Sequence, residues 1–597
     1  AEFHPYIPSE KHVPEFTRRA IILGIFAGLF FGAITVYVGL RAGLTVSASI
    51  PIAVLSISIL RAFGKATILE NNIVQTTGSA GESLAAGVIF TMPALIFLGY
   101  SLNTEYWRIF FLALLGGWLG VLFMIPLRRQ LIVKEHGNLL YPEGTACADV
   151  LVAGERGGSF AGSVFWGLGI GGLYTWLMNS MQMWPGQPEY QPKWLPGGSF
   201  RAAIYSEYLG VGYIIGPKTA GTIFAGGVFS WLVLMPAIRF FGQGITSPLY
   251  PSTIPISQMS PDQLWSAYIR PIGAGAVAAA GLITLIRTLP TIVSALTAGL
   301  KDVRAQRAGT AVETDRYERD LPVKFVLIGS LVIIVMMWAL LTFKPIPGAS
   351  TGIFSNLVAA LFVIVFGFLF VTVSSRICGL IGTSSNPVSG MTIATLMATC
   401  AMFLVAGWTG GAFAALAITI GGVVAIAAAN AGATSQDLKT GYLVGATPQR
   451  QQVALIVGVL VSAFAIGGTL IAMNKGLAKY TPDVIPLDIA QLPGGVQVET
   501  QNYAYEGKTY VLVNALGSQN VPDGKYLYNP VTREIEIQWV QGIGGEAAPA
   551  PQARLMATVV NGILTRRLPW RLIFLGVFLV LAIELLGVRS LSFAVGT

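Results

Sequence analysis

One stretch of the sequence places groups that could bind a proton or a polar ligand directly before an apolar helix. ENNIVQTTGSAGESLAAGVIF, from Glu70 to Phe90, combines two carboxylates with amides and hydroxyls. An ionisable group inside an apolar segment is costly and usually faces a cavity or a partner, so Glu82 is a candidate for binding a proton or a substrate amine. The alternative is that Glu70 and Glu82 cap helix N-termini. We favour a functional role for Glu82 and a capping role for Glu70.

Two further clusters in the first half combine ionisable residues with a proline break. LLYPEGTACADVL contains Glu143 and Asp149, and their separation turns about 600°, or about 240° net, around a helix. One of these carboxylates is therefore expected to face a pathway while the other caps or pairs. SEYLGVGYIIGPKTAGTIFAGG carries Glu207 and Lys218 around a Gly-Pro pair. Carbonyls freed by the proline could bind an anion together with the lysine, and the alternative is a lysine that extends toward the lipid headgroups.

The second half has two polar runs of similar character. The run 382–392, GTSSNPVSGMT, is helix-breaking and contains Asn386, and NAGATSQDLKTGY places Asp437 two residues before Lys439. Side chains two residues apart do not face each other on a helix, so Asp437 and Lys439 are expected to have separate partners. Glu584 stands alone in the last apolar helix, either as a buried coupling carboxylate or as a contact to a basic neighbour.

The composition indicates that these residues sit in a membrane protein. Of 597 residues, 54% are hydrophobic and 11% charged, against roughly 25% charged in soluble proteins. The long apolar runs lack the alternation of outer-membrane strands, which favours helices. Three Cys and three His without paired spacing suggest no disulfide framework, metal site or cofactor. The net charge of +9 comes from Lys and Arg at helix ends and in loops, which fits membrane orientation and not nucleic-acid binding.

The hydropathy pattern predicts an all-α polytopic membrane protein. Apolar runs of about 17 to 25 residues are long enough to span a bilayer. Four more polar stretches, at 66–83, 138–153, 377–390 and 430–446, are expected to be broken or re-entrant helices that line a cavity. Together these segments predict about 14 to 16 transmembrane helices. Basic residues beside the early spans predict a cytoplasmic N-terminus in the cell inner (cytoplasmic) membrane.

Changes in composition along the sequence divide the chain into parts. We expect an N-terminal membrane half at 1–300, a charged cytoplasmic loop at 301–324, a C-terminal membrane half at 325–473, a β-rich soluble and extracytoplasmic insert at 474–570, and a terminal membrane helix at 571–597. GLRAGLTVSASIPIAVL in the first half can be laid over GLIGTSSNPVSGMTIATL in the second, and Gln75 or Gln436 follows each. A two-half repeat of the kind found in secondary transporters and chance similarity are equally open at this point.

Several long motifs resemble the oligopeptide transporter (OPT) family, in its prokaryotic branch. These are ENNIVQTTGSAGESLAAG, LRRQLIVKEHGNLLYPEGTACADVL, SEYLGVGYIIGPKTA, ICGLIGTSSNPVSGMTIATL and SQDLKTGYLVGATPQRQQ, in order through nearly all the chain. The yellow stripe-like metal-chelate carriers are related and are similar at three of these motifs. That similarity implies that Gln75, Asp437 and Lys439 belong to shared machinery, and Asn72 lies in the same motif as Gln75.

The resemblance implies a function as well as a fold. It implies a proton-coupled secondary transporter that imports small peptides or peptide-like compounds, with metal-chelate uptake as the alternative. Its partners would be the substrate, protons and the lipid bilayer, and a homodimer stays open. The sequence has no HExxH, GxSxG, phosphate-binding loop or channel filter, so an enzyme, an ATP-driven pump or a channel is not expected. The N-terminal acidic motif of fungal and plant peptide carriers is not visible, and family members continue beyond SFAVGT, which suggests a truncated chain.

Overall fold

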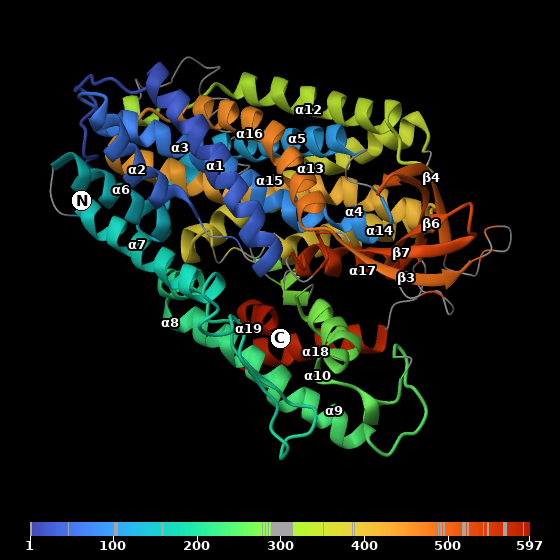
Figure 1. Ribbon diagram of the computed structural model, residues 1–597. Coiled ribbons are helices and arrows are strands. Elements are labelled where there is room, and N and C mark those ends of the chain that lie inside the picture. The colour runs from blue at the N-terminus through green and yellow to red at the C-terminus, as the bar shows by residue number, and fades with distance from the viewer. Residues whose placement is uncertain are drawn as a thin grey trace.

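The computed structural model is a long helical bundle with a small β-sheet at one end and a second helical lobe beside it (Figure 1). It describes residues 3–43, 45, 47–100, 105–156, 160–252, 254–277, 279–280, 282–283, 286–287, 290, 315–349, 351–384, 386, 388–487, 489, 492, 496–515, 521, 524–540, 542–545, 548–564, 570–588 and 590–597. Most of the predicted charged loop, residues 301–314, lies outside this description.

Two helices form the centre of the bundle. Every residue of α3 (Ile68–Thr91) is buried, and so is nearly all of α15 (Gly411–Val444) from Ala414 onward. Their polar side chains are therefore surrounded by protein, not by lipid, and must find partners on neighbouring helices.

The neighbours of the two central helices correspond. Each central helix has a long helix packed along it, α1 (Arg18–Ala42) on α3 and α13 (Ile353–Ile381) on α15. Each central helix is preceded in sequence by a helix that starts after a non-helical interruption: α2 (Ser49–Ala62) before α3, and α14 (Val388–Val405) before α15. The next long helix after each one packs on the opposite centre. After α3 and the short α4 (Ala94–Phe97), α5 (Tyr106–Arg128) contacts α15, and after α15, α16 (Pro448–Gly476) contacts α3.

Glycines allow α3 to pack closely against its neighbours. A Cβ at Gly81 would lie 2.4 Å from the carbonyl oxygen of Gly28 on α1, and one at Gly87 would lie 2.5 Å from the Cα of Ile426 on α15. Small residues at helix crossings let backbones approach and are typical of membrane helix packing.

The structure contains only some of the helix breaks that the sequence predicts. The stretches 66–83 and 430–446 are not broken, because α3 and α15 run through them as continuous helices. Their polar groups bond across the bundle instead: Ser83 donates to Asn430 at 2.6 Å, and Asn430 donates to the carbonyl of Gly117 at 2.7 Å. The stretch 377–390 does break, between Ile381 and Val388. A second break lies between α1 and α2, where the sequence has two separate apolar runs.

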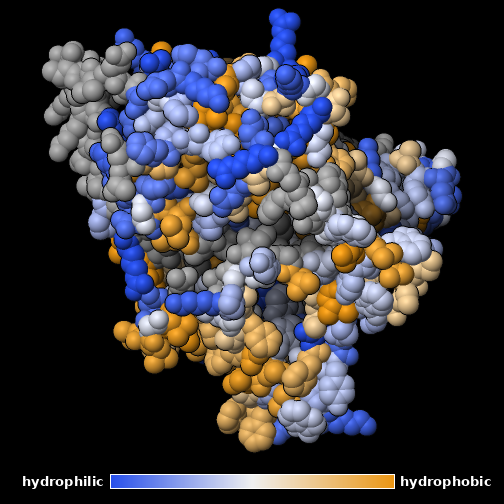
Figure 2. Space-filling model, turned by 90° about the vertical axis from the view of Figure 1, so that its left-hand side faces the viewer, coloured by the Kyte–Doolittle hydropathy of each residue, from blue (hydrophilic) through white to orange (hydrophobic). Residues whose placement is uncertain are grey.

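The surface of the bundle is that of a membrane protein. Among the described residues, nine helices are long and apolar enough to cross a bilayer. Large apolar side chains are exposed on the outward sides of α1, α12 (Val323–Phe343) and α13, including Phe26, Phe30 and Leu331. Figure 2 shows hydrophobic residues gathered over much of the lower part of one face, with hydrophilic residues above them. The polytopic membrane fold is therefore confirmed, whereas the expected count of spans stays a prediction.

The β-rich insert forms a five-stranded antiparallel sheet in the order β3-β7-β6-β5-β4. Its strands are β3 (Lys479–Pro486), β4 (Val496–Tyr505), β5 (Lys508–Ala515), β6 (Gly524–Asn529) and β7 (Glu534–Val540). The following helix, α17 (Pro551–Leu564), packs against α14 and α15 instead of joining the sheet. Apolar residues at helical spacing, among them Met556, Val560 and Ile563, are buried in the main core. The insert predicted at 474–570 therefore contains a helix that belongs to the bundle.

The second lobe lies below the bundle in Figure 1. It contains α7 (Phe160–Asn179), α8 (Ser206–Val228), α9 (Met235–Gly242), α10 (Pro261–Leu264), α18 (Trp570–Leu585) and α19 (Ser590–Gly596), with a short pair of strands, β1 (Glu189–Tyr190) and β2 (Phe200–Arg201). The terminal helix α19 crosses α8 where Gly226 meets the carbonyl of Phe593. Glu584 forms an ion pair with Arg287, which corresponds to the alternative of a contact to a basic neighbour.

Candidate functional site

The polar side chains of α2, α3 and α15 meet at one buried carboxylate. Asp437 is fully buried, and its Oδ1 accepts hydrogen bonds from the side-chain amide of Gln75 and from the hydroxyl of Ser49, the latter at 3.2 Å. Ser49 lies 3.2 Å from the hydroxyl of Ser79 as well. The other oxygen of Asp437, Oδ2, has no hydrogen-bond partner among the described residues. The carboxylate is thus held on one side and free on the other.

Glu82 lies one helical turn beyond Ser79 on α3. It is 1% exposed, and its carboxylate faces the backbone N–H of Ala48, the residue that precedes α2. Its Oε2 has no partner in the described part of the chain. Asp437 and Glu143 are the other carboxylates close enough to act on it electrostatically. Glu82 therefore supports the start of α2 and keeps one carboxylate oxygen unused.

Glu143 supports the second break in a similar way. It lies in the first turn of α6 (Pro142–Arg156), and its two oxygens accept the backbone N–H groups of Thr383 and Ser384, each at 3.0 Å. The two breaks also touch, since the backbone N–H of Ser47 donates to the hydroxyl of Ser384 at 3.2 Å. Both breaks therefore meet at the centre of the bundle, and each has a buried carboxylate beside it.

Gln436 links this region to two more helices. Its side-chain oxygen accepts the backbone N–H of Gly144 at 2.7 Å, and its nitrogen donates to the carbonyl of Cys378 at 2.8 Å. The sequence singled out Gln436 only as a repeat position, and it did not single out Ser49 or Asn430. The signal that could have found them is an amide or hydroxyl in an otherwise Ala- and Gly-rich helix, because such a group must bond to a neighbouring element.

Asn72 and Asn386 add amide oxygens at the edges of the centre. The side-chain nitrogen of Asn72 donates to Gln75 at 3.2 Å, and that of Asn386 donates to the hydroxyl of Ser374 at 2.7 Å. The oxygen of each amide is buried and has no hydrogen-bond partner among the residues that the structure describes.

Lys439 points away from Asp437. Its ammonium lies 2.9 Å from Nδ1 of His136, donates to the carbonyl of Leu139 at 3.2 Å, and lies 5.6 Å from the ring centroid of Tyr141. The separate partners expected for Asp437 and Lys439 are therefore found. Burial and the neighbouring Lys439 hold the pKa of His136 below its usual value.

The N-terminal segment covers this end of α15. The backbone N–H groups of Tyr6 and Ile7 donate to the last carbonyls of the helix at 3.0 and 3.1 Å, and Phe3 stacks on Tyr442 with 4.2 Å between ring centroids. Glu15 accepts the backbone N–H of Thr447 at 2.6 Å, and burial raises the pKa of the Glu15 carboxyl despite this bond. The segment is thus attached at both ends over the helix that carries Asp437.

Three predicted residues lie outside the buried centre. Asp149 is exposed on α6 while Glu143 is buried, as their helical spacing predicts. Lys218 is exposed on α8, which packs on α7 and α19. Glu207 lies in the same helix, and its side chain lies outside the described residues. Glu70 is not part of the centre either, because it forms the capping box with Thr67 at the start of α3 and an ion pair with Arg19 at 2.7 Å.

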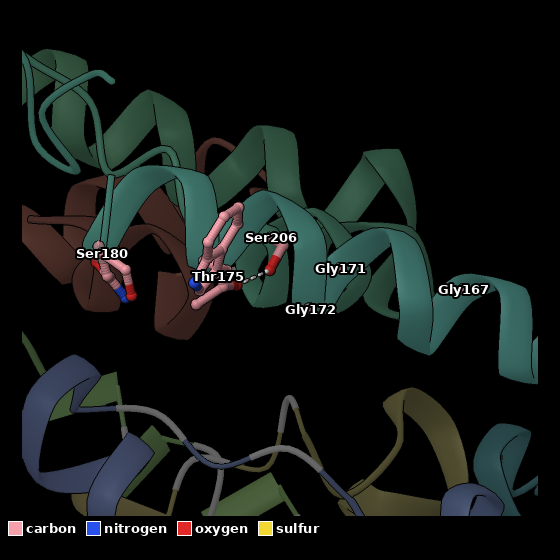
Figure 3. A pocket seen from close by; sticks show the side chains of 8 residues that line it. Gly167, Gly171, Gly172, Thr175, Ser180 and Ser206 are labelled. Carbon is pink, nitrogen blue, oxygen red and sulfur yellow. Dashed lines mark hydrogen bonds between the residues drawn. The ribbon is translucent and has the colours of Figure 1, made fainter. Parts of the chain in front are cut away.

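A cavity of about 580 Å³ lies on the second lobe, away from these residues. It is lined by α7 and by Ser206 at the start of α8, whose hydroxyl lies 3.1 Å from that of Thr175 (Figure 3). Three of its eight lining residues are glycines, and none of the eight carries an ionisable side chain. Within the described part of the chain, no three His, Cys, Asp or Glu residues are grouped so that they could hold a metal ion.

Comparison with known proteins gives the family. Residues 15–492 match the family described as OPT oligopeptide transporter protein. The chain belongs to the OPT family. The resemblance to this family is therefore confirmed. Because OPT members are transporters, this chain is a membrane transporter and not an enzyme.

Relatives extend across most of the chain. A protein of Haemophilus influenzae named as an oligopeptide transporter is 31% identical over 453 residues, which cover 73% of this chain and 69% of the relative. The metal-nicotianamine transporters YSL8 and YSL5 of Arabidopsis thaliana are 23% and 22% identical, each over 76% of this chain, and the matches cover 67% and 68% of their lengths.

Proposed function

We propose that this OPT transporter is a proton-coupled importer of small peptides or peptide-like compounds in the cytoplasmic (inner) membrane. The observation that carries the proposal is the buried centre, where Glu82 and Asp437 each keep an unpartnered oxygen beside two helix breaks. An ionised carboxylate that is buried without a partner is costly, so binding a proton or a cationic ligand at this place is favourable.

The two carboxylates are suited to different tasks. Asp437 is oriented by two side-chain donors, Gln75 and Ser49. Glu82 faces the backbone N–H of Ala48, which lies at the break between α1 and α2. A group held at a break can gain or lose a proton with a small local rearrangement, and that rearrangement would be passed to α2. We therefore assign the proton to Glu82 and substrate contact to Asp437.

The pathway in this proposal runs between the two halves along α3 and α15. The N-terminal segment and the sheet lie at opposite ends of the bundle, since α16 begins beside Glu15 and ends at the sheet. With a cytoplasmic N-terminus, as the basic residues near the first spans indicate, the sheet is extracytoplasmic. The contact between the two breaks is the point at which rocking of one half against the other would open the centre to either side.

Uptake of metal chelates is the second candidate. It is supported by the names of the two plant relatives, which describe metal-nicotianamine transport. The relative that matches this chain at 31% identity is named for oligopeptides, which favours peptides as the first candidate.

Uptake into proteoliposomes tests the proposal. The purified chain is reconstituted with the membrane potential clamped, and radiolabelled trialanine or iron(III) citrate is offered outside with an inward proton gradient. We expect trialanine to accumulate above its outside concentration and the accumulation to collapse with a protonophore. Accumulation of the iron chelate alone would move the assignment to the second candidate. Equilibration without accumulation of either compound would refute proton coupling.

A further inference from the structure

The centre of the bundle has an imbalance of hydrogen-bonding groups. In the part of it that the structure describes, the buried side-chain atoms without a partner are all oxygens. They are Oε2 of Glu82, Oδ2 of Asp437, Oδ1 of Asn72, Oδ1 of Asn386, and the hydroxyls of Thr383, Thr434 and Tyr141. Buried polar groups in native proteins nearly always have a partner, so this set indicates what an occupant of the site would offer.

The nitrogen donors of the same region are already used. Gln75, Asn430 and Gln436 each donate to an oxygen within the protein. Lys439, the cation nearest to Asp437 in sequence, directs its ammonium to His136 and to the carbonyl of Leu139. Carboxylates and amide oxygens accept but do not donate when the acid is ionised. The described centre therefore has no free nitrogen donor, its three free hydroxyls can accept as well as donate, and its ionised carboxylates carry negative charge.

The free oxygens are arranged on adjoining faces of the two central helices. Thr434 and Asp437 are three residues apart on α15, so they lie on the same side of that helix. Glu82 lies one turn from Ser79, which bonds to Ser49, and Ser49 also bonds to Asp437. A small cationic group beside Asp437 would have acceptors from both α3 and α15.

We propose that Asp437 binds the free primary ammonium group of the substrate, so that the carrier selects peptides with an unblocked amino end over metal chelates. The inference rests on the transport function proposed above and names the substrate class of the same site. An ammonium group has three N–H donors and no acceptor, which matches the free oxygens of Asp437, Thr434 and Glu82. When Glu82 carries the transported proton, its charge does not compete with that of Asp437 for the ammonium group.

The excess of free oxygen acceptors and negative charge at the centre also disfavours a metal chelate. The nitrogens of an amine chelate are bound to the metal and offer no ammonium group, and carboxylates on the chelate would face the carboxylates of the centre. A chelate could exchange ligands with the protein only at clustered metal-binding residues, and the described residues contain no such cluster.

Binding of three probes to the purified full-length chain tests the inference. Thermal stabilisation in detergent is measured with trialanine, with N-acetyl-trialanine and with iron(III) citrate. Because the acetyl group removes the charge and the charge-assisted hydrogen bonds, we expect half-maximal stabilisation by N-acetyl-trialanine to need at least about tenfold more ligand. Iron(III) citrate is expected to give no stabilisation. Equal potency of the two peptides, or stabilisation by the iron chelate alone, would overturn the inference.

A matched pair of variants assigns the preference to one residue. Asp437→Asn keeps the shape of the side chain and an oxygen for Gln75, and it is expected to bring the ratio of the two peptide potencies close to one. Asp149→Asn, at an exposed carboxylate on α6, is expected to keep the wild-type ratio. An unchanged preference in Asp437→Asn would move the amine site elsewhere. If Asp437→Asn does not fold, the comparison of the two peptides on the wild-type chain still decides.

The two proposals fail in different ways. An amine preference in binding together with uptake that ignores the proton gradient would refute proton coupling and leave the amine site standing. Proton-driven uptake of both peptides with equal potency would refute the amine site and leave coupling intact.

Discussion

Replacing Glu82 by glutamine should separate substrate movement from proton movement. The amide is neutral, as the protonated acid is, and it keeps an oxygen for the backbone N–H of Ala48. Glu82→Gln is therefore expected to hold the start of α2 in place while removing the proton cycle. We expect the variant to exchange labelled for unlabelled peptide between equal pools at a rate within about threefold of wild type. Glutamine has nearly the same volume and shape as glutamate, so the packing around the side chain should change little.

The size of the loss follows from the number of protons that the centre can carry. One pH unit is worth about 1.36 kcal/mol per proton, which is a factor of about ten in concentration. With the membrane potential clamped and one proton on Glu82, wild type should reach at most about tenfold accumulation per pH unit, and Glu82→Gln should reach a ratio of one. If Asp437 carried a second proton, the wild-type limit would be about a hundredfold.

The measurement is uptake of labelled trialanine into proteoliposomes across a series of imposed pH gradients. Asp149→Asn is the control, because it removes a carboxylate that is exposed on α6, and it should accumulate peptide as wild type does. The reasoning is refuted if Glu82→Gln still concentrates peptide with the normal dependence on pH. In that event Glu82 is structural, and the proton site must be sought at Asp437, Glu143 or Glu207.

Three further predictions follow from the packing. Replacing residues 479–540 by a short linker, which is feasible because the two ends are paired in the sheet, should retain peptide exchange, whereas extending the deletion through α17 should abolish it. Gly81→Ala places a Cβ 2.4 Å from a backbone oxygen on α1, so it should lower the free energy of unfolding by about 1 to 3 kcal/mol and the melting temperature in detergent with it. Gly28→Ala, whose Cβ would lie 3.3 Å from the nearest backbone oxygen, should change the melting temperature little. Equal melting temperatures of the two variants would contradict the close packing of α1 on α3. Burial and a neighbouring lysine lower the pKa of His136 in the folded state. The contribution of neutral His136 to the stability of the folded state is therefore complete above the unfolded pKa of 6.5 and is lost as pH falls through the lowered pKa. Phe3 of the N-terminal segment packs on His136, with 4.8 Å between the ring centroids. Acid should therefore speed protease cleavage of this segment, and His136→Gln should cancel that acceleration.

Much of this molecule could be predicted from local properties of the chain. A charged fraction of 11% cannot cover a soluble protein of this length, so the membrane class follows from composition. The strands β5 and β7 lie where strand-like sequence appears, and Glu143 and Asp149 fall on opposite sides of α6 because helical geometry requires it. The separate partners of Asp437 and Lys439 follow from the same geometry.

The continuity of the central helices could not be predicted in this way. Amides, hydroxyls and glycines in an apolar context indicate a broken helix only if lipid surrounds them. In the folded chain α3 and α15 are surrounded by protein, and partners such as Asn430 for Ser83 come from the other half, more than three hundred residues away.

The sequence alone determined the class of protein and the residue types that could carry a proton, because composition and helical period are local properties. Only the tertiary structure decided which carboxylates share a site. Asp149 and Lys218 are exposed, while Glu82, Glu143 and Asp437 are brought to the two breaks by helices from both halves. The physical reason is that the energy of a buried charge depends on the groups around it, and those groups are chosen by packing between distant segments and not by spacing along the chain.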